Sequence, residues 1–300
     1  MAASAPLLEP RYRLVLPEAA VTTIVLVGVG GTGSWLVPAL ARILYHARQR
    51  GQTLKLVLVD PDVVEEVNFG RQNFAVQSEL GVNKAIALAL RHNLALGLDI
   101  TAVPLPFVAQ TFLGWLSQQE WIPGYGRVNR LVFVGCVDNF MARRELAEAV
   151  LRGAGHAWAI DCGNGRKNGQ ILAGNLTDPA KIKVDKLGLC SGLPSPYLQE
   201  PGLLEPDPVD ASPLSCAELT LREEQSLLIN TQVAAVAAQY LYDLIIRCTL
   251  DQYATYLNLE PPTMRSLVLT PTNLARFSPP ADADGEKRHG QDNQTAAPPP

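Results

Sequence analysis

The sequence lacks the features that mark membrane-spanning, secreted and nucleic-acid-binding proteins. It contains no apolar run long enough to cross a bilayer, and its first residues have no basic region followed by an apolar core. We therefore expect no membrane partner and a cytoplasmic location. The net charge is −4 and no basic block is present, which argues against nucleic acid as a partner.

Cysteine is also sparse. The chain has five, an odd number, and none forms a Cys-x-x-Cys pair. They are Cys136, Cys162, Cys190, Cys216 and Cys248. A disulfide framework and a four-thiolate zinc site are therefore both disfavoured. What the chain has in quantity is apolar residues, 47% of 300, which is enough for the core of a globular α/β protein.

One stretch near the N-terminus combines an apolar strand with closely spaced glycines. Ile24 to Gly28 predicts a buried strand, and a helix is expected to begin near Ser34. A glycine backbone can turn tightly and approach a pyrophosphate, while a helix N-terminus offers free N–H groups to its oxygens. The glycines of this nucleotide loop would be Gly28, Gly30, Gly31 and Gly33. The same pattern also fits a strand-to-helix turn that binds nothing.

Strands and helices then alternate, as they do in a doubly wound parallel sheet. Further strands are expected at 54–60, 100–103, 131–136 and 157–162, with helices at 34–50, 78–96, 110–118 and 141–151. A hairpin-type turn at 162–170 predicts antiparallel strands at 171–174, 255–259 and 266–269. The fold class is therefore α/β, a Rossmann-like doubly wound mixed sheet with a parallel N-terminal part and antiparallel C-terminal strands.

The chain divides into five segments. Residues 1–22 are a polar arm, and 23–176 form the nucleotide-binding half. The proline-rich segment 177–213 is expected to be a crossover loop over the nucleotide face. Segment 214–278 should contain a long helix over 215–247 and the late strands, and the tail 279–300 should be disordered.

Polar side chains cluster on the loops expected to leave the carboxyl edge of the sheet. Such loops converge where the glycine loop would hold a nucleotide, and an acid at the end of the second strand is placed to bind a ribose hydroxyl. The residues are Asp60, Asp62, Asn68, Arg71, Gln72, Lys84, Asp138 and Asn139. A nicotinamide oxidoreductase, which binds a dinucleotide and passes a hydride, would need few of them.

Attack of a carboxylic acid on a nucleotide phosphate would use all of these groups. Its transition state gathers negative charge, which Arg71 and Lys84 would stabilise. Asp138 would hold Mg²⁺ against the departing pyrophosphate, and Asn68 would orient a phosphate oxygen without adding charge. Each of these residues taken alone would also fit an ordinary surface or turn position, so their joint spacing carries the prediction.

These motifs resemble those of the ThiF/MoeB and ubiquitin-activating-enzyme superfamily. Gly28-Val-Gly-Gly-Thr-Gly33 matches its GxGGxG loop, and Lys84 stands thirteen residues after Arg71, as in the family. The acidic pair Asp60 and Asp62, the Asn68, Arg71, Gln72 motif and the Asp138-Asn139 pair complete the match. The resemblance covers about residues 22–165. It implies a homodimer that uses ATP and Mg²⁺ to adenylate the C-terminal carboxylate of a small ubiquitin-like or sulfur-carrier protein of the β-grasp type.

Within the superfamily, the overall pattern looks most like the ThiF-related proteins of the PRTRC gene cassette of bacterial plasmids. That resemblance implies a small ubiquitin-like partner and, beyond it, a conjugating-type enzyme and a JAB-type metalloprotease. The zinc-binding Cys-x-x-Cys pairs of many members are missing here. A dimeric nucleotide-binding scaffold that catalyses nothing is the alternative from another functional class.

Two cysteines are candidates for a nucleophile that takes an acyl group from the adenylate. Many superfamily members place a cysteine just before the last long helix, where Cys216 stands in this chain. A helix N-terminus would stabilise its thiolate. Cys190, in the crossover segment, is the rival, and an inert thiol is the alternative for both. The other three cysteines are expected to be packing residues.

Overall fold

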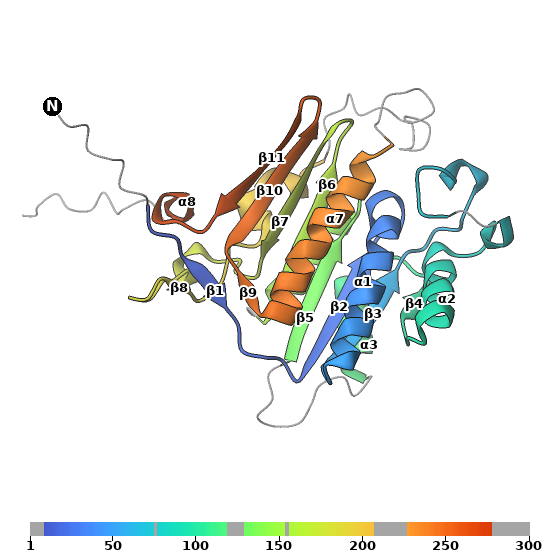
Figure 1. The fold of residues 1–300 in the computed structure, drawn as a ribbon, viewed down its shortest axis with the longest axis horizontal. Coiled ribbons are helices and arrows are strands. Elements are labelled where there is room, and N and C mark those ends of the chain that lie inside the picture. The colour runs from blue at the N-terminus through green and yellow to red at the C-terminus, as the bar shows by residue number, and fades with distance from the viewer. Residues whose placement is uncertain (1–8, 75–76, 119–128, 154–155, 207–226, 278–300) are drawn as a thin grey trace, which may run out of the picture.

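The structure is a computed structural model, described here for residues 9–74, 77–118, 129–153, 156–206 and 227–277. Its centre is an eight-stranded sheet in the order β11-β10-β7-β6-β5-β2-β3-β4 (Figure 1). Strands β2 to β6 run parallel, and β7, β10 and β11 are antiparallel to their neighbours. The predicted mixed sheet is therefore confirmed. The bounds are β2 (Val21–Val27), β3 (Thr53–Val59), β4 (Thr101–Val103), β5 (Asn129–Gly135), β6 (Ala157–Asn164), β7 (Asn168–Gly174), β10 (Gln252–Leu259) and β11 (Pro262–Val268).

The central strands are apolar on both faces because helices cover both sides of the sheet. In β2, Ile24 and Leu26 are buried against α1 (Gly31–Gln49) and α7 (Ile229–Tyr242), while Val25 and Val27 belong to the core on the opposite face. Helices α3 (Ala109–Gln118) and α4 (Phe140–Arg152) pack on that opposite face. Figure 1 shows α1 and α7 side by side in front of the sheet. No helix in the described ranges is long and apolar enough to cross a membrane.

Helix α2 (Lys84–Leu96) begins later than the sequence predicted. The side chain of Asn83 accepts a hydrogen bond from the backbone N–H of Ile86 and caps the helix. The preceding residues form only a 3₁₀ turn, η2 (Gln77–Glu79). This start places Lys84 at the first helical position, beside the end of β3.

The predicted N-terminal arm is partly incorporated into a second, small sheet. β1 (Arg13–Val15) pairs with β8 (Leu189–Cys190) and with β9 (Thr249–Leu250). Leu14 is fully buried, and Arg13 forms an ion pair with Asp251. This strand was not predicted because its partners lie far away in the sequence.

The described part of the crossover segment does not lie over the nucleotide face, where the segment was expected. Its described part, 177–206, contains η3 (Pro179–Lys181), β8, α5 (Pro196–Gln199) and η4 (Pro201–Leu204), and none of it lines the nucleotide-sized cavity described below. Tyr197 is instead buried in the core beneath α3 and α4, and η4 lies against α4. Burial of these apolar side chains explains the different path.

The long helix predicted over 215–247 is shorter where it can be described. Residues 227–228 form a turn, α7 begins at Ile229, and a π-helical turn, η5 (Asp243–Arg247), follows it. Residues 215–226 and the predicted disordered tail 279–300 lie outside the described residues. A short helix, α8 (Pro271–Ala275), follows β11.

Candidate active site

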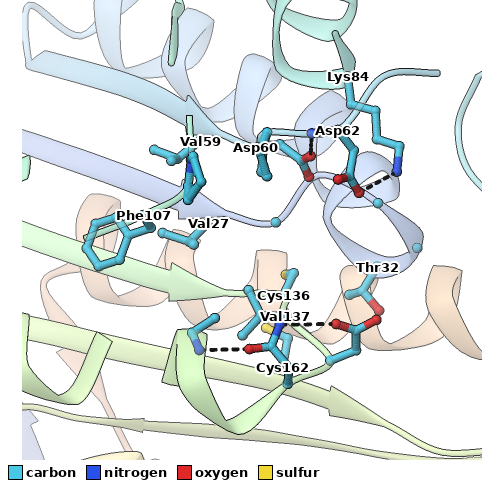
Figure 2. A pocket seen from close by; sticks show the side chains of 18 of the residues that line it. Val27, Thr32, Val59, Asp60, Asp62, Lys84, Phe107, Cys136, Val137 and Cys162 are labelled. Carbon is cyan, nitrogen blue, oxygen red and sulfur yellow. Dashed lines mark hydrogen bonds and ion pairs between the residues drawn. The ribbon is translucent and has the colours of Figure 1, made fainter. Parts of the chain in front are cut away.

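A cavity of about 530 Å³ opens at the carboxyl ends of β2, β3 and β5, where doubly wound sheets bind ligands (Figure 2). It brings together most of the site residues that the sequence predicted. Among the motif residues before the crossover, only Gly33 and Asn68 do not line it. The predicted residues that line it are Gly28, Gly30, Gly31, Asp60, Asp62, Arg71, Gln72, Lys84, Asp138 and Asn139. Phe107 and Val108 give the cavity an apolar end.

The glycine loop joins β2 to α1 and requires glycine at two positions. Gly28 has φ +84°, and a Cβ there would lie 2.6 Å from the carbonyl oxygen of Cys136. A Cβ on Gly33 would lie 1.9 Å from the carbonyl oxygen of Gly28. Gly33 therefore packs against the loop backbone at Gly28, and it does not line the cavity. Gly31 and Thr32, in the first turn of α1, line the cavity, and a helix N-terminus leaves backbone N–H groups free, which suits an anion.

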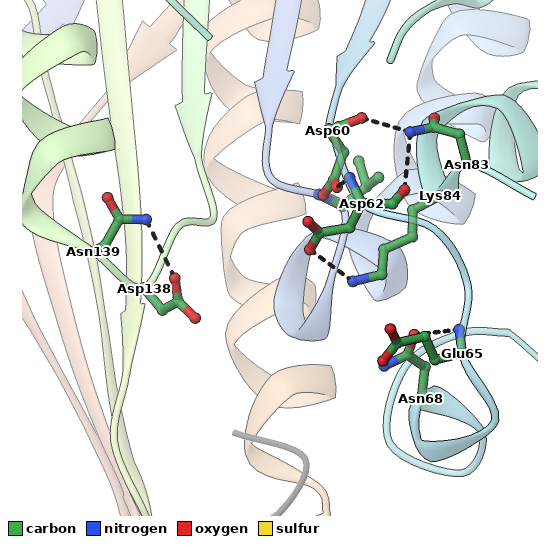
Figure 3. A network of polar contacts seen from close by, with 9 residues as sticks. Asp60, Asp62, Glu65, Asn68, Asn83, Lys84, Asp138 and Asn139 are labelled. Carbon is green, nitrogen blue, oxygen red and sulfur yellow. Dashed lines mark hydrogen bonds and ion pairs between the residues drawn. The ribbon is translucent and has the colours of Figure 1, made fainter. Parts of the chain in front are cut away.

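Asp60 and Lys84 lie on one wall of the cavity (Figure 3). The carboxylate of Asp60 accepts hydrogen bonds from the backbone N–H groups of Val29 at 2.7 Å and Asp62 at 2.9 Å. Burial raises the pKa of Asp60, and these two hydrogen bonds offset part of that effect. Lys84 Nζ forms an ion pair with the Asp62 carboxylate at 3.0 Å.

Asn83 ties this wall together, although the sequence analysis did not single it out. Its amide nitrogen donates to the carbonyl oxygens of Asp60 at 2.8 Å and Asp62 at 2.9 Å, while its oxygen caps α2. The signal that could have identified it is an Asn directly before a predicted helix, which is a preferred capping residue.

Arg71 and Gln72 are buried side chains with unsatisfied polar atoms. Arg71 Nε and Gln72 Oε1 have no hydrogen-bond partner in the part of the chain that the structure describes. The indole N–H of Trp35 donates to the Arg71 carbonyl oxygen at 2.8 Å and fixes this segment on α1. Because burying a polar group without a partner is costly, these two side chains are suited to a ligand in the cavity.

Asn68 has a different position from the one predicted. It does not line the cavity; its side-chain oxygen accepts a hydrogen bond from the backbone N–H of Glu65 at 2.9 Å, within the 3₁₀ turn η1 (Glu66–Asn68) (Figure 3). Its carbonyl oxygen accepts from the backbone N–H of Gln72. In this structure Asn68 therefore shapes the turn that presents Arg71 and Gln72.

Asp138 lies on the opposite wall, on the turn between β5 and α4 (Figure 3). It is exposed, and its carboxylate has one long contact, 3.5 Å, with the amide nitrogen of Asn139. Asn139 caps α4 by accepting from the backbone N–H of Ala142 at 2.8 Å. No group of three or more His, Cys, Asp or Glu side chains suited to a metal is found among the described residues.

Four polar residues that line the cavity were missed as site residues, namely Thr32, Glu145, Asn164 and Asn230. The side-chain oxygen of Asn230, on α7, accepts hydrogen bonds from the Thr32 hydroxyl at 3.0 Å and from the Asn164 amide. Asn230 also lies against Gly31, where a Cβ would come within 2.8 Å of its oxygen. The available signal was a polar residue at the start of an otherwise apolar helix.

Of the two candidate nucleophiles, Cys190 lies in the part of the chain that the structure describes, and Cys216 lies outside it. Cys190 is buried in β8 and does not line the cavity, and burial raises the pKa of its thiol to about 11. Cys136 and Cys162, expected to be packing residues, do line the cavity. The contact with Cys136, together with burial, raises the pKa of the Cys162 thiol.

Comparison with known families shows which family this chain belongs to. The model of the ThiF family matches residues 18–275. The chain belongs to the ThiF family. The match includes the glycine loop, both walls of the cavity and α7, so the resemblance noted in the motifs extends well beyond them. No curated protein matches the chain.

Solved structures show the same fold. E. coli MccB is 16% identical with a TM-score of 0.52, and the match covers 91% of this chain and 68% of MccB. MccB with ATP is also 16% identical with a TM-score of 0.52, covering 83% of this chain and 64% of that one. PaaA is 15% identical with a TM-score of 0.52 and the same coverage. The chain thus spans about 64% of the length of most of these structures.

Proposed function

We propose that this ThiF-family protein is an adenylating enzyme, which activates a carboxylate of a small protein or peptide by attack on the α-phosphate of ATP. The observation that carries the proposal is the cavity itself. It combines a glycine loop at a helix N-terminus, two buried side chains with unsatisfied polar atoms, a lysine and several carboxylates. The carboxylates are those of Asp60, Asp62, Asp138 and Glu145. ATP-bound MccB, which shares the fold, supports the choice of nucleotide.

Each group has a role that follows from its position. The Asp60 carboxylate accepts from ribose hydroxyls, since it lies at the end of β3 and keeps lone pairs beyond its two backbone hydrogen bonds. Arg71 and Lys84 balance phosphate charge, and Gln72 adds a neutral hydrogen bond. The apolar end at Phe107 accommodates the base. Pyrophosphate leaves as the carboxylate oxygen bonds to the α-phosphorus.

The residues present fit Mg²⁺ as part of the substrate complex. Asp138 is an exposed carboxylate on the cavity wall, and Mg²⁺ is commonly held by one or two carboxylates together with phosphate oxygens and waters. Asp138 would hold the ion, which neutralises charge on the leaving pyrophosphate.

The second substrate is proposed to be a small ubiquitin-like carrier of the β-grasp type with a free C-terminus. MccB structures that contain the MccA peptide support a protein or peptide partner in general. A PRTRC-type cassette context, with a conjugating-type enzyme and a JAB-type metalloprotease, and a homodimeric assembly are parts of this proposal. So is a later transfer of the acyl group to Cys216; the buried position of Cys190 makes it the weaker candidate.

The test is ATP–pyrophosphate exchange, with and without a β-grasp protein encoded beside this chain. Asp138→Asn removes the charge that would hold Mg²⁺, and Asp99→Asn serves as the matched control because Asp99 is an exposed carboxylate beyond the far end of α2. We expect carrier-dependent exchange in the wild type and in Asp99→Asn, and its loss in Asp138→Asn. ATP binding without exchange for any carrier would favour the nucleotide-dependent scaffold.

A further inference from the structure

A buried ion pair lies behind the wall that carries Asp138. Asp161, in the middle of β6, is 1% exposed, and its Oδ2 lies 3.4 Å from Nε of Arg143, in the first turn of α4. Neither Asp161 oxygen accepts a hydrogen bond within the described ranges, and burial raises the pKa of Asp161 to about 6. A buried carboxylate whose one partner is an arginine without a hydrogen bond to it contributes little to stability. A role of this pair in function would explain its presence.

Arg143 makes a second contact that links this pair to the active site. Its Nη2 donates a hydrogen bond to the carbonyl oxygen of Val137 at 2.9 Å. Val137 directly precedes Asp138 and itself lines the cavity. The turn that presents Asp138 is thus held at one end by the capping side chain of Asn139 and at the other by Arg143. The Asp138 side chain itself has one long contact, with the amide nitrogen of Asn139.

The surrounding residues leave room for this arrangement, and Arg143 is the charged group that acts on Asp161 within the described part of the chain. Gly135, at the end of β5, pairs with Asp161 in the sheet, and a Cβ there would lie 2.7 Å from Leu146 and 3.5 Å from Asp161 Oδ2. Tyr197 also lies near the pair, and burial raises its pKa, so its hydroxyl is neutral near pH 7. The Asp161 charge therefore acts on Arg143.

We propose that Arg143 is a positioning residue for adenylation: held by Asp161, its guanidinium fixes the Val137 carbonyl and thereby the direction in which Asp138 faces the cavity. The inference rests on the proposed function. Arginine suits this role because its planar fork can contact a carboxylate and a carbonyl oxygen at the same time, whereas lysine offers a single point charge. Neither Arg143 nor Asp161 touches the nucleotide in this account.

The test is a double-mutant cycle of Arg143→Met and Asp161→Asn, read as the kcat and ATP KM of pyrophosphate exchange. Arg143→Met alone leaves a buried carboxylate unpaired and can fail to fold, so the double variant, which removes both charges, carries the test. We expect it to lose about tenfold in kcat while ATP KM changes by less than about twofold. Asp161→Asn should add no further loss in the Arg143→Met background, since Asp161 acts through Arg143.

The matched control is Arg144→Met, because Arg144 is the next residue on α4, is exposed, and donates to the Leu204 carbonyl oxygen away from the cavity. We expect wild-type kcat for this control. A folded double variant with wild-type kcat, or additive effects in the cycle, would overturn the proposal.

Amide hydrogen exchange gives a readout that does not depend on turnover. Segment 137–142 should lose protection in the double variant and keep it in Arg144→Met, because only the former releases the Val137 carbonyl. Unchanged protection would overturn the positioning role even if no carrier is found. A wild-type protein without pyrophosphate exchange would instead count against the proposed function, so the two failures can be told apart.

Discussion

The two walls of the cavity are built in different ways. On the wall formed by the end of β3 and the start of α2, Asp60, Asp62, Asn83 and Lys84 contact one another through several hydrogen bonds and an ion pair. On the wall formed by the turn before α4, Asp138 is exposed and has a single long contact. The first wall is organised before any ligand arrives, whereas the second offers an almost unpaired charge. We infer that the first wall binds the nucleotide and the second contributes to its chemistry.

The largest effect is expected from Asp138→Ala, which tests whether the second wall acts on turnover and not on ATP binding. The exchange rate should fall about a thousandfold, while the ATP dissociation constant should stay within about threefold of the wild type, because the lost charge acts mainly on the transition state. Steady-state exchange and equilibrium ATP titration measure the two quantities. A variant that loses ATP binding to the same extent as turnover would place Asp138 among the binding groups.

The pH dependence of stability tests the support behind the second wall. The pKa of Asp161 is raised from about 3.8 to about 6 in the folded state, so its contribution to the free energy of unfolding is complete below about pH 4 and is lost as the pH rises through 6. Relative to Asp161→Asn, the wild type should therefore lose up to roughly 3 kcal/mol between pH 4 and pH 7. Urea unfolding at each pH measures this free energy. If it changed with pH in the same way in both proteins, the raised pKa of the buried Asp161 carboxyl would be contradicted.

The glycine loop lies between the walls, and Gly33→Ala tests how tightly it is fixed. A Cβ there would lie 1.9 Å from the Gly28 carbonyl oxygen, so we expect a loss of about 2 kcal/mol in stability, with weaker ATP binding. Gly114→Ala in α3 is the control, because a Cβ there meets nothing within 4 Å. That variant should be unchanged or slightly more stable. Equal unfolding midpoints for both variants would show that the loop can relax.

The smallest effect is expected on the organised wall. Lys84→Met should weaken ATP binding about tenfold through the loss of one charge-assisted phosphate contact, while kcat stays close to the wild-type value. Asp62→Asn is the companion variant, since the Asp62 side chain is 64% exposed and its ion pair with Lys84 should add little. A larger effect at Asp62 than at Lys84 in calorimetric titrations would mean that the roles are reversed.

Much of the fold could be predicted because its signals are local. The apolar runs at β2, β3 and β5 and the glycine loop carry their periodicity and turn chemistry in neighbouring residues. The pairing of β1 with β8 and β9 could not be predicted, since it joins segments far apart in sequence. The path of segment 177–206 depends on which part of the core buries Tyr197. The composition of the segment does not indicate that position.

The same distinction applies to the candidate site. Asp60, Arg71, Lys84 and Asp138 follow predicted strands at recognisable spacing, and the structure brings them to one cavity. Asn230 could not be placed there from the sequence, because its contact with Thr32 depends on how α7 packs against α1. Asn68 was assigned to the cavity on spacing alone, whereas its side chain forms a hydrogen bond within its own turn.

The measurement that tests the central claim most directly compares two forms of one carrier, the adjacent β-grasp protein with a free C-terminal carboxylate and the same protein with a C-terminal carboxamide. If the cavity adenylates a carboxylate, pyrophosphate exchange will occur with the first form and not with the second, and Asp138→Ala will abolish it. Equal exchange with both forms, or exchange that persists in Asp138→Ala, would contradict the account.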